Sequence, residues 1–274
     1  MFKMLIEVYP KRSFKVPIDA WCITPEHLKN FHDNKKLKVW EGNRLRKFTE
    51  LFKVKVKEKN NPRDVTVILK GDFTKVKRIG TEMADGNIFI DGDVGMRLGE
   101  GMKGGIIGVS GNVDSWAGCM MEGGLIEIKG NAGDYVGAAY RGGRNGMEGG
   151  TILIHGNAGN EVGCYMRGGL IRIFGNAGYF LGIHMAGGTI VVHGNCEDRI
   201  GAEMTDGKII ICGKISSVLS TFTIEDIKSK AKIDGEKIGG PFYLFRGDIA
   251  DNGKGRLYVS KIKNPHLAFY EELL

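Results

Sequence analysis

The sequence predicts an all-β protein, a right-handed parallel β-helix of about seven 19-residue coils with small mixed α/β caps at both ends. Glycine is abundant, with 43 among 274 residues, roughly twice the usual share. Seven methionines recur inside the phrase G-x-x-M-x-x-G-x-I-x-[IV]-x-G, at steps of 19, 19, 26, 19, 19 and 19 residues. A fixed period near 20 is typical of stacked repeats rather than one globular core. The methionines are Met83, Met102, Met121, Met147, Met166, Met185 and Met204.

Two glycine positions are constant in every coil, when each coil is numbered from its opening glycine. We interpret both as corners where the backbone needs a positive φ or a close approach to the next coil. The eighth position is Gly80, Gly99, Gly118, Gly137, Gly163, Gly182 and Gly201. The fourteenth position is Gly86, Gly105, Gly124, Gly150, Gly169, Gly188 and Gly207.

A strand is predicted after the second corner, because aliphatic residues alternate there with one variable residue, as Ile126 and Ile128 do around Glu127. A second, shorter inward pair occupies the third and seventh positions, for example Ala132 and Val136. Stacking in register would place equivalent residues roughly 4.8 Å apart. The crossover rule favours a right-handed winding.

Two polar and sulfur-containing ladders accompany the strands. The second position is Asn112, Asn131, Asn157, Asn176 and Asn195, preceded by Asp93, and is expected to bond its own kind and the local backbone. The methionine thioethers are expected to fill the core, since no histidine or cysteine accompanies them as a metal ligand would.

Three regions are predicted: an N-terminal cap (1–70), the repeats (71–213) and a C-terminal cap with a tail (214–274). The repeat phrases end at residues 92, 111, 130, 156, 175, 194 and 213. In the first cap we predict strands at Met4–Tyr9, Leu51–Val56 and Val65–Leu69, and a helix opened by Thr24 and Pro25. In the last region we predict a helix within Ser220–Lys230, strands at Tyr243–Phe245 and Leu257–Ser260, and a tail at Pro265–Leu274.

The 26-residue step is the one irregularity of the repeat. Seven extra residues around 140–146 must leave the coil as a loop, since the next coil resumes the register. The loop carries Arg141 and Arg144, and it is either a tolerated insertion or a binding element. Trp116 and Tyr135 share the sixth position of adjacent coils and should stack, as an interface or under an end domain. These four residues are the predicted partner-binding residues.

The charge is concentrated in one region. Residues 1–70 contain 17 Lys and Arg against 8 Asp and Glu, which indicates a solvated surface or an acidic partner. Nucleic acid is disfavoured, because no recognition motif accompanies the charge. The five cysteines lack C-x-x-C spacing, which argues against an iron–sulfur or zinc site on this chain. Their odd number and the lack of a signal peptide indicate the cytoplasm, and no apolar run is long enough for a membrane span.

No catalytic, cofactor-binding or metal-binding residue is predicted. His155 and His193 share one position two coils apart, so roughly 10 Å would separate them, too far for one metal ion. The outer strand position offers only Glu127 and Arg172 among apolar neighbours, and no Ser–His–Asp or Cys–His arrangement is suggested.

Several segments together resemble the C subunit of formylmethanofuran dehydrogenase. They are the glycine-spaced coils, GAAYRGGRNGMEGGTILIHGNAG (137–159), NPHLAFYE (264–271), ITPEHL (23–28) and VWEGNRLRKFTELFKV (39–54). The resemblance covers nearly the whole chain. The coils alone are also similar to the C-terminal β-helix domain of glutamate synthase.

The resemblance implies a structural subunit of a cytoplasmic complex of methanogenic archaea. That complex reversibly reduces CO2 with methanofuran and reduced ferredoxin to N-formylmethanofuran. It implies partners that are pterin, amidohydrolase-like and ferredoxin-like iron–sulfur subunits. The tungsto- or molybdopterin, the 4Fe-4S clusters and a dinuclear metal site are expected on those subunits. Two alternatives are a glutamate-synthase-like domain in an amidotransferase assembly and a stand-alone β-helix enzyme acting on polysaccharides.

Overall fold

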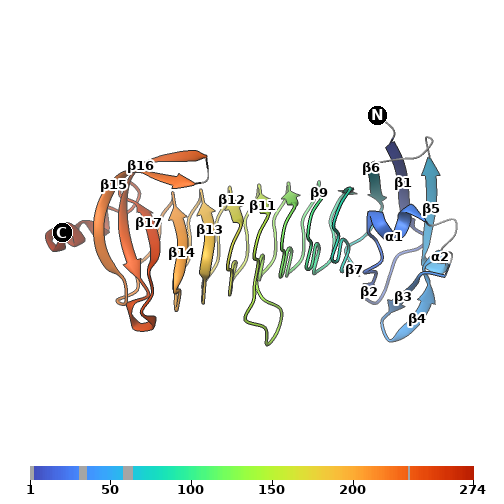
Figure 1. Ribbon diagram of the computed structural model, residues 1–274, viewed down its shortest axis with the longest axis horizontal. Coiled ribbons are helices and arrows are strands. Elements are labelled where there is room, and N and C mark those ends of the chain that lie inside the picture. The colour runs from blue at the N-terminus through green and yellow to red at the C-terminus, as the bar shows by residue number, and fades with distance from the viewer. Residues whose placement is uncertain (1–2, 31–35, 58–63, 234) are drawn as a thin grey trace.

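The computed structural model describes residues 3–30, 36–57, 64–233 and 235–274. These residues are mostly β, and one mainly parallel sheet of 13 strands runs along the longest axis, with the chain ends at opposite ends (Figure 1). The strands lie side by side in the order β15 (Thr223–Ile233), β16 (Glu236–Gly247), β17 (Gly255–Ser260), β14 (Asp206–Ile211), β13 (Ala186–Val192), β12 (Leu170–Ile173), β11 (Thr151–Ile154), β10 (Leu125–Ile128), β9 (Ile106–Val109), β8 (Asn87–Asp91), β6 (Asp64–Lys70), β1 (Lys3–Pro10) and β5 (Phe52–Lys57).

The repeat strands pair in the predicted parallel register. Ile126 of β10 lies opposite Ile107 of β9 and Ile152 of β11, so the seven extra residues before β11 do not disturb the pairing. All three isoleucines are fully buried, which confirms the alternation of inward and outward residues. The third position, part of the predicted second inward pair, forms isolated parallel bridges, such as Val94 with Val113, rather than a regular strand.

The predicted glycine corners are confirmed, since every glycine at the eighth and fourteenth positions has a positive φ. Gly118 has φ +62°, and a Cβ there would lie 2.4 Å from Cδ1 of Ile152. The backbone conformation and the packing of the next coil therefore both require glycine at this corner.

Both predicted ladders are also confirmed. The seven repeat methionines are fully buried inside the stack. Oδ1 of Asn112 accepts a hydrogen bond from the backbone N–H of Asn131 at 2.8 Å, and the same bond recurs along the ladder. The ladder ends where Oδ1 of Asn195 accepts from the N–H of Lys214 at 2.9 Å. Each asparagine thus ties one coil to the next.

The N-terminal strands extend the same sheet. β1 pairs parallel with β6 and antiparallel with β5, which confirms the three predicted strands, although Leu51 ends a helix instead of starting β5. Thr24 caps the predicted helix by accepting a hydrogen bond from the N–H of His27. The remaining elements are α1 (Pro25–Lys29), α2 (Phe48–Leu51) and a four-stranded sheet of β4 (Arg44–Lys47), β3 (Lys38–Glu41), β2 (Ile18–Asp19) and β7 (Val76–Lys77).

Part of the N-terminal positive charge lies on the edge strand. In β5, Lys53, Lys55 and Lys57 are exposed and alternate with Val54 and Val56. Lysines on an exposed edge hinder pairing with a strand of another molecule. These lysines therefore have a structural explanation that needs no acidic partner.

The predicted helix within Ser220–Lys230 is wrong, because this segment forms β15, which pairs antiparallel with β16. β-Bulges between Ile224 and Asp226 and between Lys228 and Lys230 interrupt the strand alternation. The predicted strands at Tyr243–Phe245 and Leu257–Ser260 lie within β16 and β17. A 3-10 helix, η1 (Ile249–Asp251), links β16 to β17. A second 3-10 helix, η2 (Pro265–Leu273), lies in the predicted tail.

Candidate interaction surface at the inserted loop

Trp116 and Tyr135 stack as predicted. Their ring centroids are 4.5 Å apart and the rings are inclined by only 8°. Both residues have φ +63°, a conformation that recurs at the sixth position of every coil and that directs these side chains along one corner of the stack. The repeat therefore builds an aromatic column from a backbone geometry that non-glycine residues seldom adopt.

The inserted loop adds Arg141 to this column. The chain leaves the stack as a loop before β11 (Figure 1), and the Arg141 guanidinium lies 5.4 Å from the centre of the Trp116 ring. That distance is within the range of a cation–π contact. Arg141, Trp116 and Tyr135 line one surface hollow of 260 Å³, together with Tyr140 and Tyr165.

Arg144 lies apart from the other three predicted residues. It does not line the hollow, and its backbone carbonyl accepts a hydrogen bond from Nη2 of Arg167 at 3.3 Å. The structure thus brings Trp116, Tyr135 and Arg141 together, whereas Arg144 lies beside Arg167 and outside the hollow.

Arg97 and Tyr140 belong to the surface but were not predicted from the sequence. The Arg97 guanidinium lies 4.0 Å from the centre of the Tyr140 ring, which in turn meets Trp116 edge-on at 5.8 Å. Arg97 occupies the same sixth position as Trp116 and Tyr135. That shared position was the available signal, whereas the placement of Tyr140 depends on the loop.

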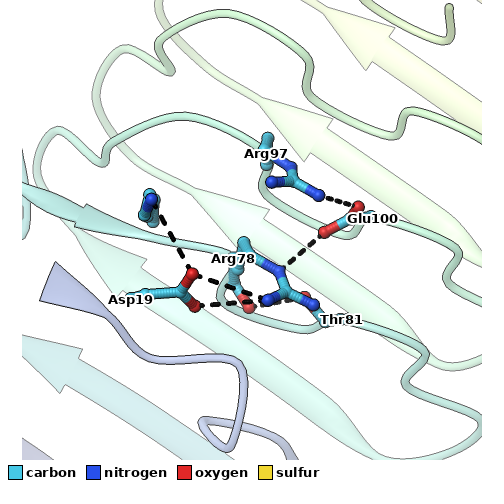
Figure 2. A network of polar contacts seen from close by, with 6 residues as sticks. Asp19, Arg78, Thr81, Arg97 and Glu100 are labelled. Atoms are coloured by element: carbon cyan, nitrogen blue, oxygen red, sulfur yellow. Dashed lines mark hydrogen bonds and ion pairs between the residues drawn. The ribbon is translucent and has the colours of Figure 1, made fainter. Parts of the chain in front are cut away.

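Arg97 belongs to an ion-pair network that reaches the N-terminal region. Arg97 donates to Glu100, which also accepts from Nε of Arg78 at 2.9 Å. Nη1 of Arg78 lies 3.5 Å from Asp19 of β2. Figure 2 shows the contacts that run from Asp19 through Arg78 and Glu100 to Arg97. Glu100 is only 7% exposed, so its contacts with the two arginines are shielded from water. The network connects the N-terminal region to the loop through Arg97.

Tyr135 has a further partner on the next coil. Its hydroxyl donates a hydrogen bond to Oε1 of Glu161 at 3.0 Å, and this bond raises the pKa of Tyr135 above its usual value. The phenol is therefore a neutral hydrogen-bonding group at physiological pH and not a base.

The histidines in the described part of the chain are spread over separate contacts. Phe174 lies between His155 and His193, with ring centroids 5.1 and 5.0 Å away, so the spacing agrees with the prediction. His184 stacks on Tyr165 and lies 3.2 Å from Glu203. Among the residues that the structure describes, no group of three His, Cys, Asp or Glu side chains is arranged to hold a metal ion.

Glu127 and Arg172 do not converge on the outer strand face. Glu127 pairs with Lys129 and with His155, and the hydrogen bond from Lys129 lowers the pKa of that carboxyl. A general acid needs the opposite shift. Arg172 instead pairs with Glu236 of β16 at 2.5 Å.

The cysteine thiols are expected to be unreactive in the folded chain. Burial raises the pKa of Cys22, Cys119, Cys164 and Cys196 to about 12, so little thiolate exists at pH 8. Cys212 is half-buried and should react first with a thiol reagent. We expect labelling of the native protein to be slow and limited to Cys212, and all five thiols to react once the chain is unfolded. Rapid native labelling that persists in Cys212→Ser would contradict this.

The arrangement defines a class of protein: a parallel-sheet repeat protein that carries stacked aromatic rings and an arginine at its inserted loop. Within the described residues, no helix combines the length and the apolar content needed to cross a bilayer. No protein-family model matches the chain.

The resemblance to the C subunit of formylmethanofuran dehydrogenase is confirmed by comparison with curated proteins. Over 89 residues the chain is 42% identical to the C subunit of the tungsten-containing enzyme 2 of Methanothermobacter wolfeii, a match that covers 32% of this chain and 33% of that protein. It is 40% identical over 89 residues to the C subunit of the molybdenum-containing enzyme 1 of Methanosarcina barkeri, covering 32% and 30%. The chain thus spans about a third of the length of the curated relatives it matches.

One solved structure matches almost the whole chain. It is a chain of the formyltransferase/hydrolase complex of Methylorubrum extorquens in complex with methylofuran. The TM-score is 0.79 at 29% sequence identity, and the match covers 93% of this chain and 99% of the other. The likeness therefore extends beyond the repeats to both end regions.

Proposed function

We propose that this chain is a non-catalytic structural subunit of a cytoplasmic formylmethanofuran dehydrogenase. The observation that carries the proposal is the likeness of nearly the whole chain to one chain of a multi-subunit complex. The names of the curated relatives support the assignment to this enzyme. The proposed reaction of the complex is the reversible formation of N-formylmethanofuran from CO2, methanofuran and reduced ferredoxin. The pterin, the iron–sulfur clusters and the dinuclear metal site would lie on the partner subunits.

The proposed role is that of a rigid spacer. Residues 71–213 would wind as a right-handed parallel β-helix, with residues 1–70 and 214–274 as its caps. The in-register pairing from β8 to β14 and the asparagine ladder support a stiff stack, since each coil is bonded to the next over its full width. Such a spacer would hold the pterin and amidohydrolase-like subunits at a fixed separation.

The inserted loop is the proposed contact with one of these subunits. Arg141 is exposed and already lies against Trp116, so docking would immobilise few additional side chains. Arg141 and Arg144 form no ion pair with a described residue, which leaves both guanidinium groups able to bind carboxylates of a partner.

The double variant Arg141→Ala/Arg144→Ala tests this contact. We expect recovery of the partner subunits with the tagged chain to fall at least tenfold, while the melting temperature of the chain stays within about 2 °C, because both residues are exposed on the surface. The matched variant Arg141→Lys/Arg144→Lys keeps the charge but loses the planar guanidinium, so it should retain part of the binding. Full recovery with the alanine variant would remove the loop from the proposal.

A formyltransferase/hydrolase complex is the second candidate, because the whole-length match belongs to one. The curated relatives are named for tungsten or molybdenum, whereas the name of the solved complex mentions neither metal. Tungsten or molybdenum measured in the complex that co-purifies with the tagged chain would favour the dehydrogenase. A complex that forms N-formyl transfer products but contains neither metal would favour the second candidate.

A further inference from the structure

One buried carboxylate holds two neighbouring arginines. Arg78 and Arg97 occupy the sixth position of successive coils, and both have a positive φ. Glu100 accepts a hydrogen bond from Nε of Arg78 at 2.9 Å and another from Arg97, and Figure 2 shows its carboxylate between the two guanidinium groups. Two adjacent guanidinium groups repel each other, so the buried charge of Glu100 is what allows both to stay at this corner.

The position of the Arg97 side chain depends on this carboxylate. Within the described part of the chain, Glu100 is the one acidic residue paired with Arg97, and Nε of Arg97 is buried without a hydrogen-bond partner. The same guanidinium lies 4.0 Å from the centre of the Tyr140 ring. A cation–π contact near the surface is worth only about 0.5–1 kcal/mol, less than the cost of leaving a largely buried charge unpaired. Without Glu100, the guanidinium would therefore turn to water and leave the ring.

Tyr140 is the residue at which the inserted loop leaves the coil. Its ring also meets Trp116 edge-on at 5.8 Å. Its carbonyl accepts a hydrogen bond from the N–H of Gly143 at 2.8 Å, which closes the turn that contains Arg141. A displacement of Tyr140 would thus displace this turn as well.

The other end of the network belongs to the N-terminal region. Nη1 of Arg78 lies 3.5 Å from the Asp19 carboxylate, and Nζ of Lys77 lies 3.7 Å from it. Asp19 is part of β2, which pairs in parallel with β7 at the start of the repeats. Arg78 is therefore held between Asp19 on one side of the network and Glu100 on the other.

We propose that Glu100 is a positioning residue for the inserted loop, because it keeps Arg97 against Tyr140 at the base of that loop. The link through Arg78 to Asp19 makes the order of the loop depend on the packing of the N-terminal region. The inference deepens the proposed function and rests on it for the role of the loop in docking. A partner would meet a loop that is already in place, which lowers the ordering cost of binding.

Glu100→Gln tests the inference, since it removes the charge and keeps the size of the side chain. Trypsin cleaves after arginine and needs a locally open chain, and the loop contains Arg141 and Arg144. We expect cleavage at these two arginines of the full chain, identified by mass spectrometry, to become about tenfold faster. Cleavage at Lys129, directly after β10, should keep the wild-type rate, because only a global loss of stability would accelerate both places.

Matched substitutions at the sixth position separate the loop contact from the arginine itself. Arg97→Met removes the cation from Tyr140 and should also accelerate cleavage of the loop. Arg97→Lys keeps a charge beside Glu100 and should stay within about threefold of the wild type. Arg199→Met is the control: Arg199 has φ +65° against +62° for Arg97, and it lies over another ring, 5.4 Å from the centre of Phe180. The control should leave the loop as resistant as in the wild type.

The outcomes separate the inference from the proposed function. Unchanged cleavage of the loop in both Glu100→Gln and Arg97→Met would overturn the inference, and so would an equal acceleration at Lys129 in both. Asp19→Asn should accelerate cleavage of the loop by about threefold, and an unchanged rate would overturn the dependence on the N-terminal region. Recovery of partner subunits with the tagged Glu100→Gln chain should fall several-fold. A loosened loop with wild-type recovery would support the positioning role and overturn the proposed docking at the loop.

Discussion

Replacing Gly168 by alanine is expected to destabilise the chain by about 3 kcal/mol, because it forces two coils apart. A Cβ at this position would lie 2.1 Å from the backbone carbonyl oxygen of Glu148 on the preceding coil. Backbone atoms cannot move aside as a side chain can. The N–H of Gly168 also donates to the carbonyl of Met147 at 3.1 Å, so the displacement would lengthen an inter-coil hydrogen bond. Thermal unfolding should show a melting temperature lower by roughly 5–10 °C.

The control for this variant is Gly239→Ala. Gly239 has no atom within 4 Å of the added Cβ and no positive φ. Its stability should stay within about 0.5 kcal/mol of the wild type. Alanine also restricts the unfolded chain, which at an unstrained position raises stability rather than lowering it. Equal losses in the two variants would therefore contradict the coil-spacing explanation.

Met147→Ala is the second substitution with a large expected effect, a loss of about 3 kcal/mol. Met147 is fully buried, and its Sδ lies 3.5 Å from where a Cβ of Gly137 would be, while its Cε reaches the corner at Gly169. Truncation therefore leaves a cavity that the corner glycines cannot fill. Thermal unfolding, followed by circular dichroism, measures the loss.

Met147→Leu separates packing from sulfur chemistry. Leucine has a similar volume, so we expect a loss below about 1.5 kcal/mol and unchanged assembly with partners. If leucine proved as damaging as alanine, the thioether itself would be required, and the interpretation of the methionine ladder as core filling would be wrong.

The repeat could be predicted because its constraints recur. Each coil repeats the same corner, so one positive φ at Gly118 implies the others, and the aliphatic alternation sets the register of β9, β10 and β11. The end regions carry no such redundancy. Ile224, Ile227 and Ala231 of β15 are three and four residues apart, which is the pattern of an amphipathic helix. Two β-bulges interrupt the pairing of this strand, so its sequence lacks the regular alternation that would indicate a strand.

The candidate surface was predictable only where it follows the repeat. The Trp116 and Tyr135 stack follows from their shared coil position, and the structure confirms it. The contacts of Arg141 with Trp116 and of Arg97 with Tyr140 join the coils to a loop whose path the repeat does not define.

The in-register strand pairing also makes the length of the molecule adjustable only in whole steps. Adding or removing one coil would change the distance between the ends of the stack by one strand spacing, about 4.8 Å, while keeping every corner in phase. An insertion of any other length has to bulge outward, as residues 140–146 do. The number of coils therefore sets the distance between the two ends of the stack, and the length of an inserted loop can change without changing that distance.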